Sequence, residues 1–409
     1  MANTNPIPTF GPNNTKVSTI THAAVASWGG FVYQGLCALC VAVEKILENE
    51  DNVREWYLNV EGYEDCAVLN NKKEIVSLHQ AKCYKDDKSF EDEFKKMEDK
   101  RAYWYGKGIC KPDIPLYFHC NLQLKYSHGV VEYKYSDGNV NKSHEDVWKH
   151  LGSLVEKYTR KNNIPVSSDI KFEQLIANMS DHITMLDEKA KDPRNSDMQA
   201  ISVEKSISFA SIINLLRSDN DRMTVAERVR ASVFYLRVCM EQFKFNNTDI
   251  DYAKVDRFTE VLEGMSTEEL ERVVRKLFPD VDIAFGSNIF AEITNSYRFA
   301  FLRNIILEAN QMNDNDVQWR IIDGLAHPST LGRGKSIKEH CMGIMKNKNL
   351  PSELFRDYRW IVGDIIGEID DIKQGAGNIT STDDANYDNI TKPRKVGLTG
   401  ANGINKRMV

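Results

Sequence analysis

At 409 residues the chain is longer than a domain with a single hydrophobic core usually is, so two domains are expected. Its composition, 42% hydrophobic and 27% charged, is that of an ordinary globular protein, and no apolar run is long enough to predict a membrane span. The net charge of −6 argues against a dedicated high-affinity nucleic-acid binder, because neutralising phosphates needs a surplus of Lys and Arg.

The first 19 residues are polar and contain several prolines, and we expect them to be disordered. They lack the basic flank and apolar run of a signal peptide, so a cytoplasmic location and no membrane attachment are expected. Cysteines in a cytoplasmic chain of this size stay reduced.

Four cysteines raise the question of a zinc site. Cys37 and Cys40 have the spacing of half such a site, and Cys66 with Cys83 could complete it beneath the first helix. No second Cys-x-x-Cys pair is present, so the pattern favours cysteines packed in the core as small hydrophobic side chains.

The segment Ala23–Asn49 is predicted to be the first helix, because apolar residues recur along it at helical spacing. The predicted core stripe consists of Val32, Leu36, Leu39, Val43 and Ile46. Gln34 lies off that stripe near the helix start, where a capping or solvated amide is one interpretation. Glu44 lies one helix face away from Gln34.

The next two segments, Trp56–Leu69 and Ile75–Tyr84, are predicted to be strands closed into a hairpin by the turn-forming residues 70–73. Gln80 and Lys82 share one face of the second strand, and Asp65 at a bend of the first can lie across from them. An acid, an amide oxygen and an amine then meet in a volume that suits a divalent metal and an activated water attacking a phosphodiester. The alternative is a plain Asp65–Lys82 ion pair on an exposed hairpin.

Further along, a helix from Ser89 carries acidic residues first and basic ones later, which complements the helix dipole. Its basic and aromatic side is more simply a solvated face than a DNA contact. A buried strand (Pro115–Lys125), an edge strand (Gly129–Tyr135) and a helix (Ser143–Lys161) follow, with a linker over 162–165. His119 and His128 are interpreted as structural residues.

From Ser168 onward the periodicity is helical almost throughout. The predicted helices are Ile170–Ala190, Val203–Leu216, Val225–Phe243, Tyr252–Glu263, Thr267–Leu277, Phe285–Met312 and Ser352–Ile372. The apolar stretch Phe299–Leu307 is expected in a core in preference to a subunit contact. Residues 374–409 show no periodicity and are expected to form a flexible tail. No GxxxxGK[ST] phosphate loop is present.

The motifs resemble the PD-(D/E)xK nuclease superfamily in its Mrr-like Gln-x-Lys variant. The likeness rests on Gly29–Leu36 at the helix start, on Asp65, and on Gln80-Ala81-Lys82, and it covers roughly residues 20–130. It is strongest to nuclease effector subunits of anti-phage systems of the Lamassu or ABC-three-component and CBASS types. The implied fold over 20–165 is a restriction-endonuclease-like mixed sheet flanked by helices. Together with the helical periodicity that follows, which predicts an all-α assembly domain over 166–373, the expected fold class is α+β.

The resemblance also implies roles for individual residues. Asp65 and the Gln80 oxygen would hold Mg²⁺ or Mn²⁺ with the carbonyl of residue 81, and Glu61 is a further candidate ligand. Lys82 would orient or deprotonate the water and stabilise charge on phosphorus. Gln34 would replace the first-helix acid of Mrr-like enzymes, and the remaining candidates at the site are Glu44 and Glu64.

The expected function is a metal-dependent DNA endonuclease acting as effector subunit of an anti-phage complex. Its expected partners are double-stranded DNA, an SMC- or ABC-type ATPase and an accessory subunit, and it would become a homo-oligomer when active. Two alternatives remain open: an inactive nuclease-like scaffold that binds the ATPase, and an RNA-directed nuclease of the same fold.

Overall fold

The computed structural model describes residues 28–84, 90–124, 129–191, 198–246, 252–263, 265–277, 317–322, 324–329, 336–346, 358–363, 367–377 and 396–408. The chain divides into two compact units, each of which is described by itself. The first comprises residues 1–165 with 182–218, and the second comprises 166–181 with 219–409.

The first unit is built on a six-stranded mixed sheet with the order β5-β4-β3-β2-β1-β6. Its strands are β1 (Tyr57–Val60), β2 (Cys66–Leu69), β3 (Ile75–Lys82), β4 (Leu116–Cys120), β5 (Val130–Glu132) and β6 (Ile207–Ser208). Strands β6, β1, β2 and β3 pair antiparallel, whereas β3, β4 and β5 pair parallel. The predicted mixed sheet is therefore present, and the turn over 70–73 joins β2 to β3 as predicted.

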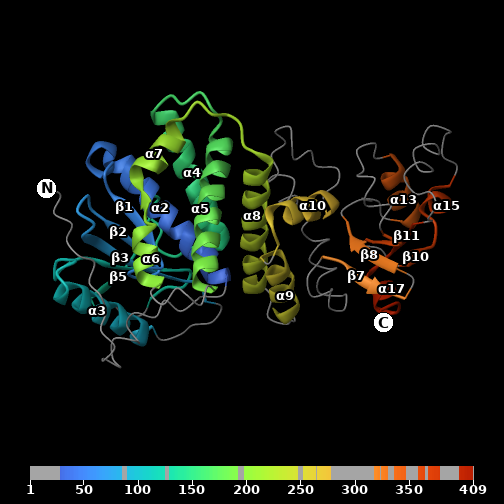
Figure 1. The fold of residues 1–409 in the computed structure, drawn as a ribbon, viewed down its shortest axis with the longest axis horizontal. Coiled ribbons are helices and arrows are strands. Elements are labelled where there is room, and N and C mark those ends of the chain that lie inside the picture. The colour runs from blue at the N-terminus through green and yellow to red at the C-terminus, as the bar shows by residue number, and fades with distance from the viewer. Residues whose placement is uncertain are drawn as a thin grey trace. The chain divides into compact units, whose positions relative to one another are not determined.

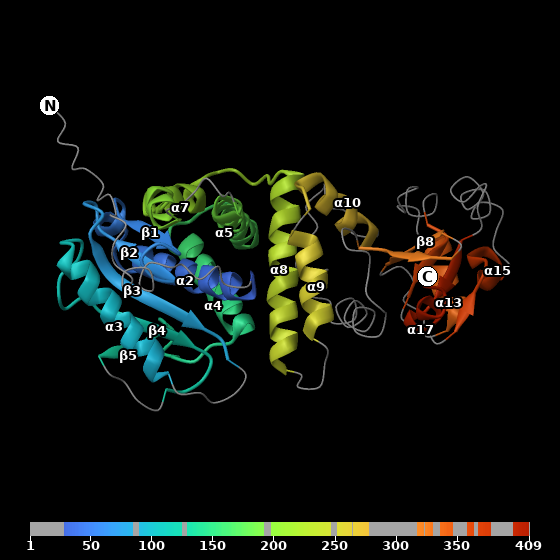
Figure 2. The same ribbon diagram turned by 60° about the horizontal axis from the view of Figure 1, so that its bottom comes forward.

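Helices cover both faces of this sheet (Figures 1 and 2). Helix α2 (Trp28–Val53) packs with α4 (His144–Lys161) on one face, and α3 (Glu91–Gly106) packs on the other. Every residue of the predicted α2 stripe is buried. The helical backbone breaks at Asn49 (φ −158°, ψ 86°), where the sequence predicted the helix to end, and then continues to Val53.

One predicted strand is two strands in the structure. Segment Trp56–Leu69 folds as the β1–β2 hairpin, with residues 61–65 as its loop. Glu61 has a positive φ of 62°, and a Cβ on Gly62 would lie 2.3 Å from Asn59 Oδ1. The chain turns here because Gly62 lets the backbone approach the buried Asn59 side chain closely.

The end of β1, directly before the hairpin loop, is hydrogen-bonded to a segment that lies more than 130 residues later in the sequence. The predicted helix Val203–Leu216 is instead α6 (Met198–Glu204), strand β6 and α7 (Phe209–Arg217). Asn59 donates to Ser202 O (3.0 Å) and Ser206 Oγ (3.1 Å), and the Ser202 hydroxyl donates to Val60 O. Residues 182–218 therefore complete the first unit.

The second unit contains several of the helices that the sequence predicted after residue 165. Helix α5 (Ser168–Lys191) begins in it, and α8 (Val225–Asn246), α9 (Tyr252–Glu263) and α10 (Thr267–Leu277) follow. Helix α10 begins with a capping box, since Ser266 N donates to Glu269 Oε2 (2.7 Å) and Glu269 N donates to Ser266 Oγ (3.3 Å). Helix Phe285–Met312 and the stretch Phe299–Leu307 lie outside the described residues.

A second sheet distinguishes this unit from the all-α domain that periodicity suggested, although the α+β class is confirmed. Its strands are β7 (Trp319–Ile321), β8 (Gly324–Pro328), β9 (Trp360–Val362), β10 (Glu368–Ile369) and β11 (Gly397–Thr399), in the order β10-β11-β9-β8-β7. They accompany helices α13 (Ile337–Lys346), α15 (Ile372–Ala376) and α17 (Ala401–Asn405). Strands β9 and β10 replace part of the predicted helix Ser352–Ile372, and β11 lies within the segment predicted as a flexible tail. Among the described helices, none combines the length and apolar character needed to cross a bilayer.

Candidate functional site

Asp65 lies at the end of the hairpin loop, directly before β2. Cys66 pairs with His79, which places Asp65 beside the carboxyl end of β3. Its Oδ2 accepts a hydrogen bond from Ala81 N at 2.9 Å and lies 3.5 Å from Lys82 Nζ. The strand register thus brings Asp65 and Lys82 together, as the hairpin pattern predicted.

The Gln80 side chain is buried between the same groups. In one orientation of its amide, Nε2 donates to Asp65 Oδ2 at 3.4 Å. Turned by half a rotation, the amide satisfies both of its ends at shorter distances: Nε2 donates to Glu64 Oε1 at 2.5 Å, and Oε1 accepts from Lys82 Nζ at 3.1 Å. In that orientation the Lys82 ammonium faces an amide oxygen and a carboxylate oxygen together, a donor pair of the kind that Mg²⁺ prefers.

Lys82 is partly exposed at the end of β3, with 28% of its side chain accessible. Burial alone would lower the pKa of its ammonium, but the neighbouring acidic groups, Asp65 first, outweigh burial and raise the pKa above its usual value. Lys82 is therefore a positive charge at neutral pH.

Glu64, one residue before Asp65, is buried and forms an ion pair with Lys100 of α3. Burial raises the pKa of Glu64 to about 7, against the opposing charge of Lys100. Glu64 is a candidate that the sequence predicts, whereas Lys100 is not. No local signal marks Lys100, because it reaches the loop only through the docking of α3 on the sheet.

Glu61 begins the loop, and its Oε1 is shielded from solvent with no hydrogen-bond partner among the described residues. Burial, and then the charge of Asp65, raise the pKa of Glu61 well above its usual value. A buried oxygen with no partner costs free energy unless something else pairs with it. This unpartnered oxygen suits the predicted role of Glu61 as a further cation ligand.

Gln34 of α2 is also buried, and its Oε1 has no hydrogen-bond partner within the described part of the chain. Cys37 follows three residues later and so shares its helix face. Burial raises the pKa of the Cys37 thiol to about 12, and the charge of Asp65 adds to the rise. The buried amide excludes the solvated interpretation of Gln34, and its role in the site stays a prediction.

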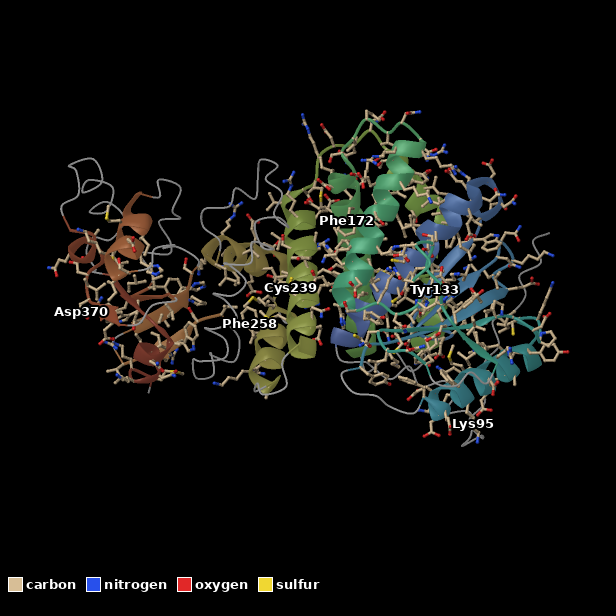
Figure 3. All side chains as sticks on the ribbon, turned by 180° about the vertical axis from the view of Figure 1, so that it is seen from behind. Lys95, Tyr133, Phe172, Cys239, Phe258 and Asp370 are labelled. Carbon is tan, nitrogen blue, oxygen red and sulfur yellow. The ribbon has the colours of Figure 1, made fainter. Side chains whose placement is uncertain are left out.

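Glu44 belongs to a different cluster. Its carboxylate accepts from Tyr133 OH (2.6 Å) and Ser136 N (2.7 Å) and lies 2.8 Å from His150 Nε2. Figure 3 labels Tyr133 among the elements of the first unit. All of these partners are structural contacts between α2, α4 and the segment after β5, so the structure does not bring Glu44 to Asp65.

A buried histidine pair lies on the α2 face of the sheet. His79 Nδ1 is 3.0 Å from His119 Nε2, and His119 Nδ1 is 2.9 Å from Tyr135 OH. Burial lowers the pKa of His119 to about 3, so the ring is neutral at ordinary pH. These contacts support the structural interpretation of His119, and His128 lies outside the described residues.

The side chains that could bind a cation beside Asp65 offer oxygen atoms. Within the described ranges, no group of three or more His, Cys, Asp or Glu side chains is arranged to hold a metal ion. Cys37, Cys40 and Cys66 are buried, as expected of core cysteines. A site built on Asp65, Gln80 and bound waters fits Mg²⁺, which keeps several of its waters.

The outer face of α3 carries charges of both signs. Lys95, labelled in Figure 3, is exposed, and Lys96 Nζ lies 3.5 Å from Glu93. The pattern is that of a solvated helix face, which agrees with the interpretation favoured from the sequence.

Comparison with known proteins identifies one family. A family model described as C-terminal domain 1 of the ABC-three component (ABC-3C) systems matches residues 130–369, which are 240 of the 409 residues. The match begins at the first residue of β5, inside the sheet that carries Asp65 and Lys82. No curated protein and no solved structure matches the chain.

Proposed function

This chain belongs to the ABC-three-component family of anti-phage defence systems, and on that premise we propose that its first unit is the metal-dependent DNA endonuclease of such a system. One observation carries the proposal: Asp65, Gln80 and Lys82 converge within 3.5 Å of one another from a hairpin loop and the end of its neighbouring strand. A carboxylate, an amide oxygen and an ammonium in contact are the groups that metal-assisted phosphodiester hydrolysis uses.

The cation would be held by Asp65 and the Gln80 oxygen, with Glu61 as the further ligand. Mg²⁺ or Mn²⁺ would supply charge stabilisation at the phosphate and a more acidic water. Lys82 remains protonated because its pKa is raised, so its role is to hold the phosphate and neutralise charge growing on it. Removal of the water's proton is then left to a group other than the Lys82 ammonium.

A catalytically inactive scaffold is the second candidate. The observation that favours it is the direct Lys82–Asp65 contact, which is also how a plain ion pair would look. The nuclease proposal accounts in addition for the buried oxygens of Glu61 and Gln34 that lack a hydrogen-bond partner in the described part of the chain, which an ion pair leaves unexplained.

The family is one of three-component systems, so partner subunits accompany this chain. We assign to the second unit the binding of those partners, an ATPase and an accessory subunit, because no catalytic constellation emerges within its described residues. Release from the partners, or oligomerisation, would activate the nuclease.

The test is digestion of supercoiled plasmid by the purified chain and by the whole three-component assembly, with Mg²⁺ or Mn²⁺ and with a chelator. The expected result is loss of supercoiled DNA only with the cation. Parallel digestion of structured RNA identifies the preferred nucleic acid. Digestion that survives the chelator, or none even by the whole assembly, would contradict the proposal.

A further inference from the structure

We infer that Glu64 and Lys100 are positioning residues that hold the Gln80 amide with its oxygen toward the cation. The inference rests on the proposed nuclease function, and it explains how a glutamine, whose amide has two unlike ends, can serve as a cation ligand at this position. Glu64 is thereby assigned to the support of the site and not to the ligands themselves.

An amide differs from a carboxylate in having two unlike ends. A carboxylate offers an oxygen whichever way it turns, whereas a glutamine turned by half a rotation presents its NH₂ group, which donates and cannot bind a cation. A glutamine at this position therefore needs a hydrogen-bond acceptor on its nitrogen side. Outer groups that orient a ligand in this way are part of most metal sites.

Glu64 supplies that acceptor. Its side chain is only 1% exposed, and its Oε1 lies 2.5 Å from the Gln80 nitrogen in the orientation that satisfies both groups. The opposite orientation would place the amide oxygen against the carboxylate and the NH₂ group against the Lys82 ammonium. Two repulsive contacts would then replace two attractive ones, and only the long contact from Nε2 to Asp65 Oδ2, at 3.4 Å, would be gained.

Lys100 fixes Glu64 in turn. Its ammonium contacts Glu64 Oε2, so both carboxylate oxygens are engaged by side chains that come from different elements. The Lys100 charge also keeps a buried carboxylate beside Asp65 without leaving it uncompensated.

The loop and α3 are joined at a second point one helical turn away. Tyr63 packs against Trp104 edge to face, with ring centroids 5.0 Å apart. Trp104 lies four residues after Lys100 and so on the same face of α3. Helix α3 thus contacts two successive loop residues, Tyr63 and Glu64, immediately before Asp65.

The decisive experiment exchanges the acid and the amide. Gln80→Glu alone should weaken Mn²⁺ binding at least tenfold, because two buried carboxylates would face each other. Gln80→Glu with Glu64→Gln restores one donor and one acceptor, and binding should return to within about threefold of the parent. Calorimetric titration of Mn²⁺ into the full-length chain measures both.

Lys100→Met provides a second, independent variant. Removal of a positive charge would by simple electrostatics strengthen cation binding, whereas loss of positioning should weaken it about tenfold. Lys96→Met, on the exposed side of the same helix, is the matched control and should leave Mn²⁺ affinity unchanged. Thermal melts of all variants report folding.

Three results would overturn the inference: parent-like binding by Gln80→Glu, no recovery in the exchanged pair, or tighter binding by Lys100→Met. If the parent binds Mn²⁺ and cleaves DNA while these results appear, the nuclease proposal stands and only the positioning role falls. A parent that neither binds Mn²⁺ nor cleaves within the assembly would overturn both.

Discussion

Lys82 extends from the end of β3 with part of its side chain in solvent, so its packing contributes little to stability. Lys82→Ala should therefore reduce plasmid cleavage by at least about 100-fold, the size of effect expected when a charge-stabilising group is lost. The melting temperature should change by no more than a few degrees.

The matched control for this variant is Lys149→Ala, which removes an exposed lysine paired with Glu145 on α4. It should cleave as the parent does. Parent-like cleavage by Lys82→Ala with an unchanged melt would remove Lys82 from the site.

Of the two proposed cation ligands, Asp65 and Gln80, only Asp65 is charged. An amide is a poorer ligand than a carboxylate for a hard cation. Asp65→Asn should abolish measurable Mg²⁺ or Mn²⁺ binding in a calorimetric titration. Asp99→Asn, on the exposed side of α3, should bind as the parent does. Equal binding by all three proteins would show that the cation, if any, binds elsewhere.

Glu44 gives a pH-dependent prediction. Burial by itself would raise the pKa of Glu44, but hydrogen bonds from His150, Tyr133 and Ser136 outweigh it and lower the pKa below 4.5. A carboxyl whose pKa is lower in the folded chain stabilises the fold above its unfolded pKa, and this stabilisation is lost as pH falls through the folded pKa.

Glu44→Gln should consequently reduce the free energy of unfolding by about 2 kcal/mol at pH 7. The difference from the parent should shrink steadily below pH 4.5. Urea unfolding at pH 7 and pH 3.5 measures it, and an equal loss at both values would show that the charge of Glu44 is not what matters.

The residues of the site differ in how far their positions could be predicted from the sequence. Asp65, Gln80 and Lys82 could be placed from the sequence, because a two-residue alternation and one tight turn determine their register. Lys100 could not, because its place depends on how α3 docks on the sheet. Glu44 shows the opposite failure: its spacing from Gln34 on one helix suggested a fallback acid, but its partners come from α4 and the segment after β5.

Among the elements, β11 has the clearest consequence for stability. It lies between β10 and β9 in the second sheet, and Gly397 is close to the Trp360 ring, where a Cβ would lie 2.5 Å away. Deletion of residues 396–409 should therefore unpair both neighbouring strands. Hydrogen exchange at Trp360–Val362 should speed up by more than tenfold.

Lys406→Ala changes an exposed residue of the same segment and should leave that exchange unchanged. Slow exchange at Trp360–Val362 in the truncated chain would mean that the sheet does not need β11, as the predicted flexible tail implied.

Elements of different length were predictable to different degrees. Helices α9 and α10 have the predicted ends because each offers more than ten residues of periodicity, and α10 also has a capping box. Strands β7, β9 and β11 have three residues each, too few for a two-residue period to be recognised in the sequence. The same shortness explains why segment 56–69 was predicted as one strand.

For the whole molecule, we expect control by assembly. One nuclease site cuts one strand, so breaking a duplex requires two copies, and a chain with a net charge of −6 has no basic surplus to hold DNA alone. The full-length chain fused to a tetramerising coiled coil should make double-strand breaks at least tenfold faster than the unfused monomer. A monomer that linearises plasmid as fast as the fusion would rule out this form of control.

The hydrogen bonds between Ser202 and the β1 end have a consequence for synthesis. A ribosome synthesises the loop carrying Asp65 early, but it makes Ser202, and the β6 strand that pairs with β1, only after more than 130 further residues. Until then the end of β1, which leads into the loop carrying Asp65, lacks its hydrogen bonds to Ser202 and its pairing with β6. A nascent or prematurely terminated chain therefore lacks part of the support of the candidate site, so the proposed activity is expected only after residues 202–208 have been made.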